Sequence, residues 1–168
     1  MFLSNLINKR VSLVFLLPLF LGMCTVFTFQ PFNFTFLNFL IFPILFTILV
    51  FVEKKSRSTY RKKPYLINLF YVGYFFGVGF FLSGTYWISH SLTFDSDLNY
   101  LIPISLVFIP LCLGLFYGVS AIIAGPFLKN NFPSILLFCA SFSFLDYLRA
   151  KIFTGFPWNL WAYSWSWF

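Results

Sequence analysis

Long apolar runs separated by short polar stretches make up most of the chain. An α-helix rises about 1.5 Å per residue, so roughly 20 apolar residues are needed to cross the ~30 Å hydrocarbon core of a bilayer. This pattern predicts an all-α membrane protein, a polytopic helical bundle with about five transmembrane helices. The helices are expected at residues 11–29, 34–52, 65–87, 101–127 and 132–152.

The composition supports lipid rather than water as the main solvent of the chain. Of the 168 residues, 60% are hydrophobic and 9% are charged, whereas soluble proteins are about 25% charged. The net charge of +7 would suggest a nucleic-acid partner in a polar protein. Here the basic residues lie between the apolar runs, so no nucleic-acid partner is expected.

The basic residues also predict how the bundle is oriented. Six of the 11 Lys and Arg residues lie in the loop 53–63, and Lys9, Arg10 and Lys129 fall on the same side if five helices alternate. The positive-inside rule makes that side cytoplasmic. The N-terminus is therefore expected in the cytoplasm and the aromatic segment 153–168 on the opposite, outer face.

The first helix has an alternative interpretation. A basic start, an apolar run and Cys24 resemble a lipoprotein signal peptide. Met23 is larger than the residues usually found before the cleavage site, and the apolar run continues past Cys24. A retained membrane anchor is therefore favoured.

Two glycine pairs predict close helix contacts. Gly73 and Gly77 form one GxxxG pattern, and Gly114 and Gly118 form another. Such patterns let helix backbones approach closely, either within the bundle or between two copies of the chain. Packing within the bundle is the favoured interpretation.

Asp146 and Arg149 are the notable charges within the predicted helices. Each would cost about 2.5–3.5 kcal/mol at the bilayer centre. Their spacing of three places them on one helical face, where an ion pair relieves much of that cost. The pair either lines a cavity or substrate path or fixes its helix within the bundle, and the sequence leaves both interpretations open.

The sequence shows no signal for a metal site, a cofactor or a catalytic centre. Cys24, Cys112 and Cys139 are separated within apolar runs, which is typical of small apolar packing residues. His90 has no second histidine or nearby cysteine, so an interfacial hydrogen-bonding role is favoured. Neither a GxSxG sequence nor a glycine-rich phosphate loop is present.

Aromatic residues gather on the predicted outer face. Gly155 and Pro157 are expected to end the last helix, and four of the five tryptophans follow within residues 158–167. Trp87 also maps to this face. An ordinary aromatic belt marks both interfaces, so the asymmetry favours an outer surface that binds lipid or docks a domain.

Two segments resemble one enzyme family. FLDYLRAKIFTGFPW, followed by NLWAYSW, and GFFLSGTYWISHSL are similar to segments of bacterial apolipoprotein N-acyltransferases. The resemblance implies that residues 1–168 form the N-terminal transmembrane domain of such an enzyme, in the bacterial inner membrane with the C-terminus on the periplasmic side. The residues that match the family motif, and are expected to shape a lipid access path or a docking surface, are Asp146, Arg149, Thr154, Gly155, Phe156, Pro157, Trp158 and, more loosely, Trp87.

The same resemblance implies a reaction and its partners. The family moves an acyl chain from a phospholipid, through a thioester on a cysteine, to the amine of a lipoprotein's diacylglyceryl-cysteine. A nitrilase-like domain with a glutamate, a lysine and a cysteine carries the chemistry. Glu53 is the only glutamate here and lies in the cytoplasmic loop, and no residue matches the catalytic set. The chain alone is expected to be inactive, as a truncated product, an incomplete gene or a subunit whose partner is a separate nitrilase-like chain.

A small membrane scaffold or transporter subunit is the alternative function. Transporters place ionisable residues or broken helices near the bilayer midplane. Asp146 and Arg149 are predicted nearer the outer side, which weakens this alternative.

Overall fold

A computed structural model describes residues 11–59, 65–94, 96–152 and 159–165, and within these ranges the chain is helical with no strand. The prediction of an all-α polytopic bundle is confirmed. The elements in chain order are η1 (Ser12–Leu16), α2 (Leu17–Cys24), η2 (Thr25–Thr28), η3 (Thr35–Leu37), α3 (Asn38–Thr59), α4 (Tyr65–Gly84), α5 (Tyr86–Ser91), η4 (Leu92–Phe94), η5 (Ser96–Leu101), α6 (Ile102–Ala124), η6 (Gly125–Phe127), α7 (Phe132–Lys151) and η7 (Trp161–Trp165).

Four helical stretches are long and apolar enough to cross a membrane among the described residues. They are Thr35–Ser56, Tyr65–Gly84, Asp97–Phe127 and Phe132–Lys151, and a shorter apolar stretch covers Ser12–Thr28.

Helix ends differ from the predicted bounds where local chemistry overrides hydropathy. α3 continues to Thr59, past the expected end at residue 52, because the Glu and Lys residues that follow are good helix formers. α4 ends at Gly84 rather than residue 87, since Thr85 leaves the helical region at φ −114° and ψ 7°. α7 begins where Asn131 caps it, its side chain accepting a hydrogen bond from the Ser134 amide at 3.1 Å.

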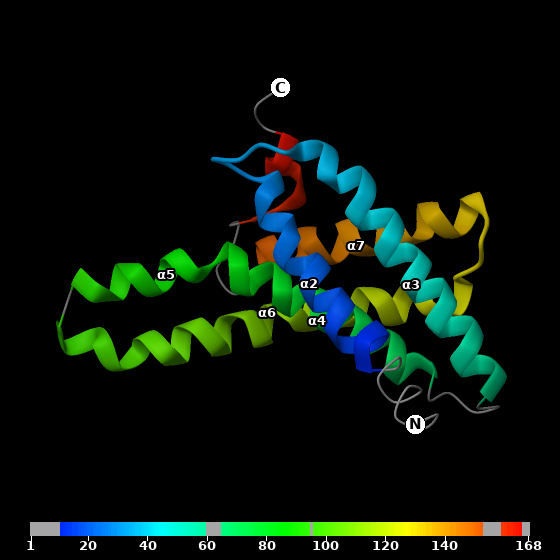
Figure 1. The fold of residues 1–168 in the computed structure, drawn as a ribbon, viewed down its shortest axis with the longest axis horizontal. Helices are drawn as coiled ribbons and strands as arrows, with labels where there is room; N and C mark the ends of the chain where they lie inside the picture. Colours follow the sequence, from blue (N-terminus) through cyan, green and yellow to red (C-terminus); the bar gives the residue numbers. More distant parts are fainter. Residues whose placement is uncertain (1–10, 60–64, 95, 153–158, 166–168) are drawn as a thin grey trace.

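The connections between helices gather at two ends of the bundle (Figure 1). The end of α3, the start of α4 and the turn between α6 and α7 lie toward one end. The Asn68 amide there donates to the Ser56 hydroxyl at 2.8 Å and joins α4 to α3. The turn before α3 and the segment η7 lie together at another end, at the top of the view, and α5 projects from the bundle to the left. This second end carries the candidate site.

Glycines allow α4 to lie at the centre of the bundle. A Cβ atom on Gly77 would lie 2.9 Å from the Gly114 Cα and 2.9 Å from the Tyr117 Cβ, so α4 and α6 are in backbone contact there. On another face of α4, Gly79 lies against the backbone of Leu19 and Met23 in α2. The two GxxxG patterns therefore pack against each other within one chain, as the bundle-packing interpretation expected.

Candidate functional site

The predicted pair on α7 forms a buried ion pair. Arg149 Nη2 lies 2.7 Å from Asp146 Oδ1, and Arg149 Nε donates to the same oxygen at 3.2 Å. Arg149 is only 1% exposed and Asp146 is 8% exposed. The helix brings them together because residues three apart share a face. Because the pair is buried away from water, each of its remaining hydrogen-bonding groups needs a partner within the protein to offset the cost of desolvation.

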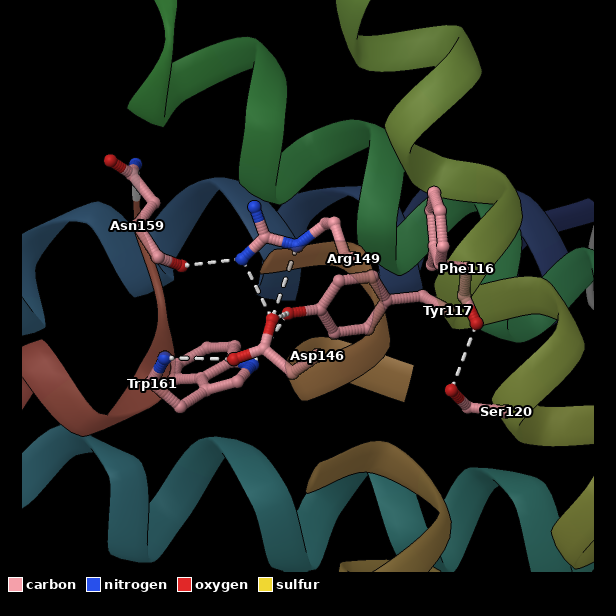
Figure 2. Close-up of polar contacts among 7 residues, drawn as sticks. All are labelled: Phe116, Tyr117, Ser120, Asp146, Arg149, Asn159 and Trp161. Atoms are coloured by element: carbon pink, nitrogen blue, oxygen red, sulfur yellow. Dashed lines mark hydrogen bonds and ion pairs between the residues drawn. The ribbon is translucent and has the colours of Figure 1, made fainter. Parts of the chain in front are cut away.

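The segment after α7 supplies several of those partners (Figure 2). The backbone amide of Trp161 donates to Asp146 Oδ2 at 3.1 Å, and the backbone carbonyl of Asn159 accepts from Arg149 Nη2 at 3.3 Å. The ion pair thus holds the chain at two backbone points, ten and 15 residues away from its own members.

Tyr117 on α6 completes this arrangement. Its hydroxyl donates to Asp146 Oδ1 at 3.4 Å and accepts from Trp161 Nε1 at 2.6 Å. Figure 2 shows the phenol and the indole converging on the carboxylate from α6 and from the segment after α7. We refer to Tyr117, Asp146, Arg149, Asn159 and Trp161 as the Asp146 cluster.

Aromatic rings surround the cluster. The Trp161 ring stacks on Phe80, with 4.7 Å between centroids and 15° between planes. It meets Phe42 of α3 edge-on at 4.6 Å. The guanidinium of Arg149 lies 4.9 Å from the ring centroid of Phe81, a cation–π distance. Side chains from α3, α4, α6 and α7 therefore all pack around segment 159–165.

η3 and the first residue of α3 add a second attachment of η7. The hydroxyl of Thr35 donates to the Ser164 carbonyl at 2.9 Å, and the side-chain amide of Asn38 donates to the Ser164 hydroxyl at 3.1 Å. Both donors and Ser164 are buried. Segment 159–165 is consequently fixed to the bundle along most of its length.

Comparison with known proteins identifies the family. Residues 21–168 match the family model described as the apolipoprotein N-acyltransferase N-terminal domain. The chain belongs to the apolipoprotein N-acyltransferase family. Among its relatives, the apolipoprotein N-acyltransferase of Rhizobium etli is 32% identical over 150 residues, covering 89% of this chain and 28% of the relative. That of Brucella melitensis is 33% identical over 144 residues, covering 85% and 27%, and that of Rickettsia bellii is 40% identical over 96 residues, covering 56% and 19%.

The chain spans less than a third of the length of these apolipoprotein N-acyltransferases. Of the residues predicted from the family motif, Asp146 and Arg149 lie at the centre of the site. Thr154, Gly155, Phe156, Pro157 and Trp158 lie outside the described residues.

Trp87 lies on α5, with 41% of its surface exposed. Its neighbour in the GTYW motif, Gly84, packs against the side chain of Asn159. The two segments that resemble apolipoprotein N-acyltransferases are therefore in contact with each other, through Gly84 of one and Asn159 of the other.

Sequence analysis did not single out Tyr117, Asn159 or Trp161 as site residues. A usable signal existed for two of them, because a buried Tyr hydroxyl or Trp indole N–H normally finds a hydrogen-bond partner. Tyr117 stands in the middle of a long apolar run in α6. Few groups could accept a hydrogen bond from its hydroxyl, and Asp146 in α7 is one of them.

The geometry indicates what the Asp146 cluster can do. The carboxylate accepts from Arg149, Tyr117 and the Trp161 amide, so its lone pairs are engaged in structural bonds. This burial favours the interpretation in which the pair fixes elements of the bundle over the one in which it lines a path. Within the described ranges, no group of three or more His, Cys, Asp or Glu residues is placed to hold a metal ion.

Proposed function

We propose that this chain is the membrane portion of an apolipoprotein N-acyltransferase. Such an enzyme transfers a phospholipid acyl chain to the amine of the N-terminal diacylglyceryl-cysteine of lipoproteins. The observation that carries the proposal is the family match over residues 21–168, together with a site built from the motif residues Asp146 and Arg149. Phospholipid and apolipoprotein are the proposed substrates.

The role we assign to these residues is support rather than chemistry. The Asp146 cluster and the Thr35–Asn38–Ser164 contacts fix segment 159–165 to one end of the bundle. We propose that this end is the surface on which a nitrilase-like catalytic domain rests. The 168 residues include a single glutamate, Glu53 in α3, so we propose that they do not transfer an acyl group by themselves.

A chimera tests the proposed function. Residues 21–168 would replace the matching segment of the Rhizobium etli enzyme, in a strain depleted of its own N-acyltransferase. We expect the chimera to restore N-acylation of lipoproteins, measured by mass spectrometry of their N-terminal peptides. The 168-residue chain expressed alone should restore none.

Two outcomes would contradict these proposals. A chimera that reaches the membrane at the level of the intact Rhizobium etli enzyme, yet leaves lipoproteins diacylated, would contradict the assigned role. Any N-acylation by the 168-residue chain alone would contradict its proposed inactivity.

We also propose an inner-membrane location with the Lys54–Lys55 end of the bundle in the cytoplasm. The turn between α6 and α7 lies toward the same end (Figure 1). It contains Lys129, which supports the positive-inside assignment. The exposed residues Asn99 and Asn130 form a matched pair for testing it. In intact spheroplasts, a membrane-impermeant maleimide is expected to label Asn99→Cys strongly and Asn130→Cys only after lysis. The reverse pattern would invert the proposed topology.

A further inference from the structure

The two halves of segment 159–165 are buried to different extents. Residues 159–161 are half-buried, and the ring of Trp161 packs against the hydrophobic core of the bundle. Among residues 162–165, only Ser164 is buried. Segments with few buried apolar contacts are the first to open in a folded protein. Apolar packing therefore holds the first half more firmly than the second.

The first half is also held by hydrogen bonds to charged groups. The Trp161 amide donates to the Asp146 carboxylate at 3.1 Å, and the Asn159 carbonyl accepts from the Arg149 guanidinium at 3.3 Å. Hydrogen bonds in which one group is ionised are roughly twice as strong as those between neutral groups. Breaking either bond would also leave a buried charge with one partner fewer. We therefore expect residues 159–161 to stay in place.

The hydrogen bonds of Ser164 are with neutral groups. The Thr35 hydroxyl donates to the Ser164 carbonyl at 2.9 Å, and the Asn38 side-chain amide donates to the Ser164 hydroxyl at 3.1 Å. The ring of Trp165 meets that of Phe39 at 5.8 Å, where the two side chains are 41% and 69% exposed. These contacts involve no charge and bury little apolar area.

The attachment of Ser164 leaves a buried acceptor unsatisfied. Oδ1 of Asn38 has no hydrogen-bond donor within the described residues, although Asn38 is only 7% exposed, and Oδ1 of Asn33 is in the same state. A buried acceptor without a donor bears the cost of desolvation with no bond to offset it. By contrast, both oxygens of Asp146 accept hydrogen bonds. Closure of the second half against α3 therefore carries a cost that the Asp146 contacts do not.

We propose that residues 162–165 act as a strap, which opens from η3 and α3 by turning about Trp161 while residues 159–161 stay bound to Asp146 and Arg149. Opening breaks the two hydrogen bonds of Ser164. It also lets water donate to Oδ1 of the Asn38 side chain, which offsets part of that loss. The inference is independent of the proposed acyl transfer, because it concerns a motion within these 168 residues and not activity.

The reactivity of a buried thiol measures this opening. The full 168-residue chain, with Cys24, Cys112 and Cys139 replaced by alanine, would carry either Ser164→Cys or Thr85→Cys. Methyl methanethiosulfonate, a small uncharged reagent that enters detergent micelles, would be added to the folded chain in dodecyl maltoside. Mass spectrometry would give the reaction rate, which is divided by the rate for the same variant denatured in sodium dodecyl sulfate and urea.

Thr85→Cys is the matched control for the anchored half. Thr85 is 5% exposed and Ser164 is 0% exposed, and Thr85 follows Gly84, against which the Asn159 side chain packs. We expect the normalised rate for Ser164→Cys to exceed that for Thr85→Cys by about tenfold or more, as local opening of one half requires. Equal rates would overturn the inference, because the whole segment would then leave together or stay closed.

Asn38→Leu separates an opening strap from a segment loosened by the cysteine itself. The substitution removes the unsatisfied oxygen at similar volume, together with the donor to position 164. Adding it to Ser164→Cys should lower the labelling rate several-fold, because apolar groups of similar shape close without an unmade hydrogen bond. A rate that stays the same or rises, with circular dichroism unchanged, would mean that Asn38 only fastens the segment, and it would overturn the inference.

Discussion

Replacing Arg149 with methionine is expected to lower the free energy of unfolding by about 3–5 kcal/mol, because it leaves the Asp146 carboxylate buried without its counter-ion. Methionine retains much of the apolar volume, so loss of charge and of hydrogen bonds dominates the effect. The bond from Arg149 Nη2 to the Asn159 carbonyl is lost as well. Segment 159–165 should therefore become more susceptible to proteolysis than the helices themselves.

Thermal unfolding in detergent, followed by circular dichroism, provides the measurement. Lys151→Met is the matched control, since it removes an exposed cation two residues further along the same helix. The double variant Asp146→Leu with Arg149→Met should recover much of the lost stability, because replacing both members of a buried pair by apolar residues is often nearly neutral. If Arg149→Met and Lys151→Met unfolded at the same temperature, the structural role of the pair would be refuted.

The second large effect is expected for Trp161→Ala, with a loss of about 3–5 kcal/mol. The substitution removes a ring that stacks on Phe80 and meets Phe42, and it leaves the Tyr117 hydroxyl without its indole donor. Large-to-small changes in a packed region cost both transfer free energy and cavity formation. We expect separation of segment 159–165 from α4 and α6, with the ion pair still present.

Trp165→Ala is the matched control for this change. Trp165 lies four residues further along, is 41% exposed, and meets Phe39 at the surface, so its loss should cost far less. Trp161→Phe separates the contribution of ring packing from that of the indole hydrogen bond, because it retains an aromatic ring and removes the indole donor. It should cost about 1–2 kcal/mol. Equal unfolding temperatures for Trp161→Ala and Trp165→Ala would mean that segment 159–165 does not contribute to bundle stability through Trp161.

Both predictions bear on the proposed function in the same way. Neither residue is assigned to the acyl-transfer chemistry, so their effects should reach activity only through the position of segment 159–165. In the chimera, Arg149→Met and Trp161→Ala are therefore expected to reduce N-acylation together with stability. The conservative Trp161→Phe should retain most N-acylation.

The sequence by itself determined the class of the protein, an all-α polytopic bundle. Five spans were expected, and among the described residues four apolar helices are long enough to cross a membrane, with a shorter apolar stretch at Ser12–Thr28. Apolar runs of about 20 residues are decisive because backbone groups must be satisfied internally in lipid, which leaves the helix as the only structure for such segments. The pairing of Asp146 with Arg149 was also predictable, since it depends only on a spacing of three within one helix. The motif residues around them were sufficient to indicate the family.

Tertiary structure alone decided what surrounds the pair. Tyr117 reaches Asp146 from 29 positions away and Trp161 from 15, and no periodicity along the chain encodes such contacts. They depend on glycines such as Gly77 and Gly114, which set the distance between α4 and α6, and on the position of segment 159–165 against α3.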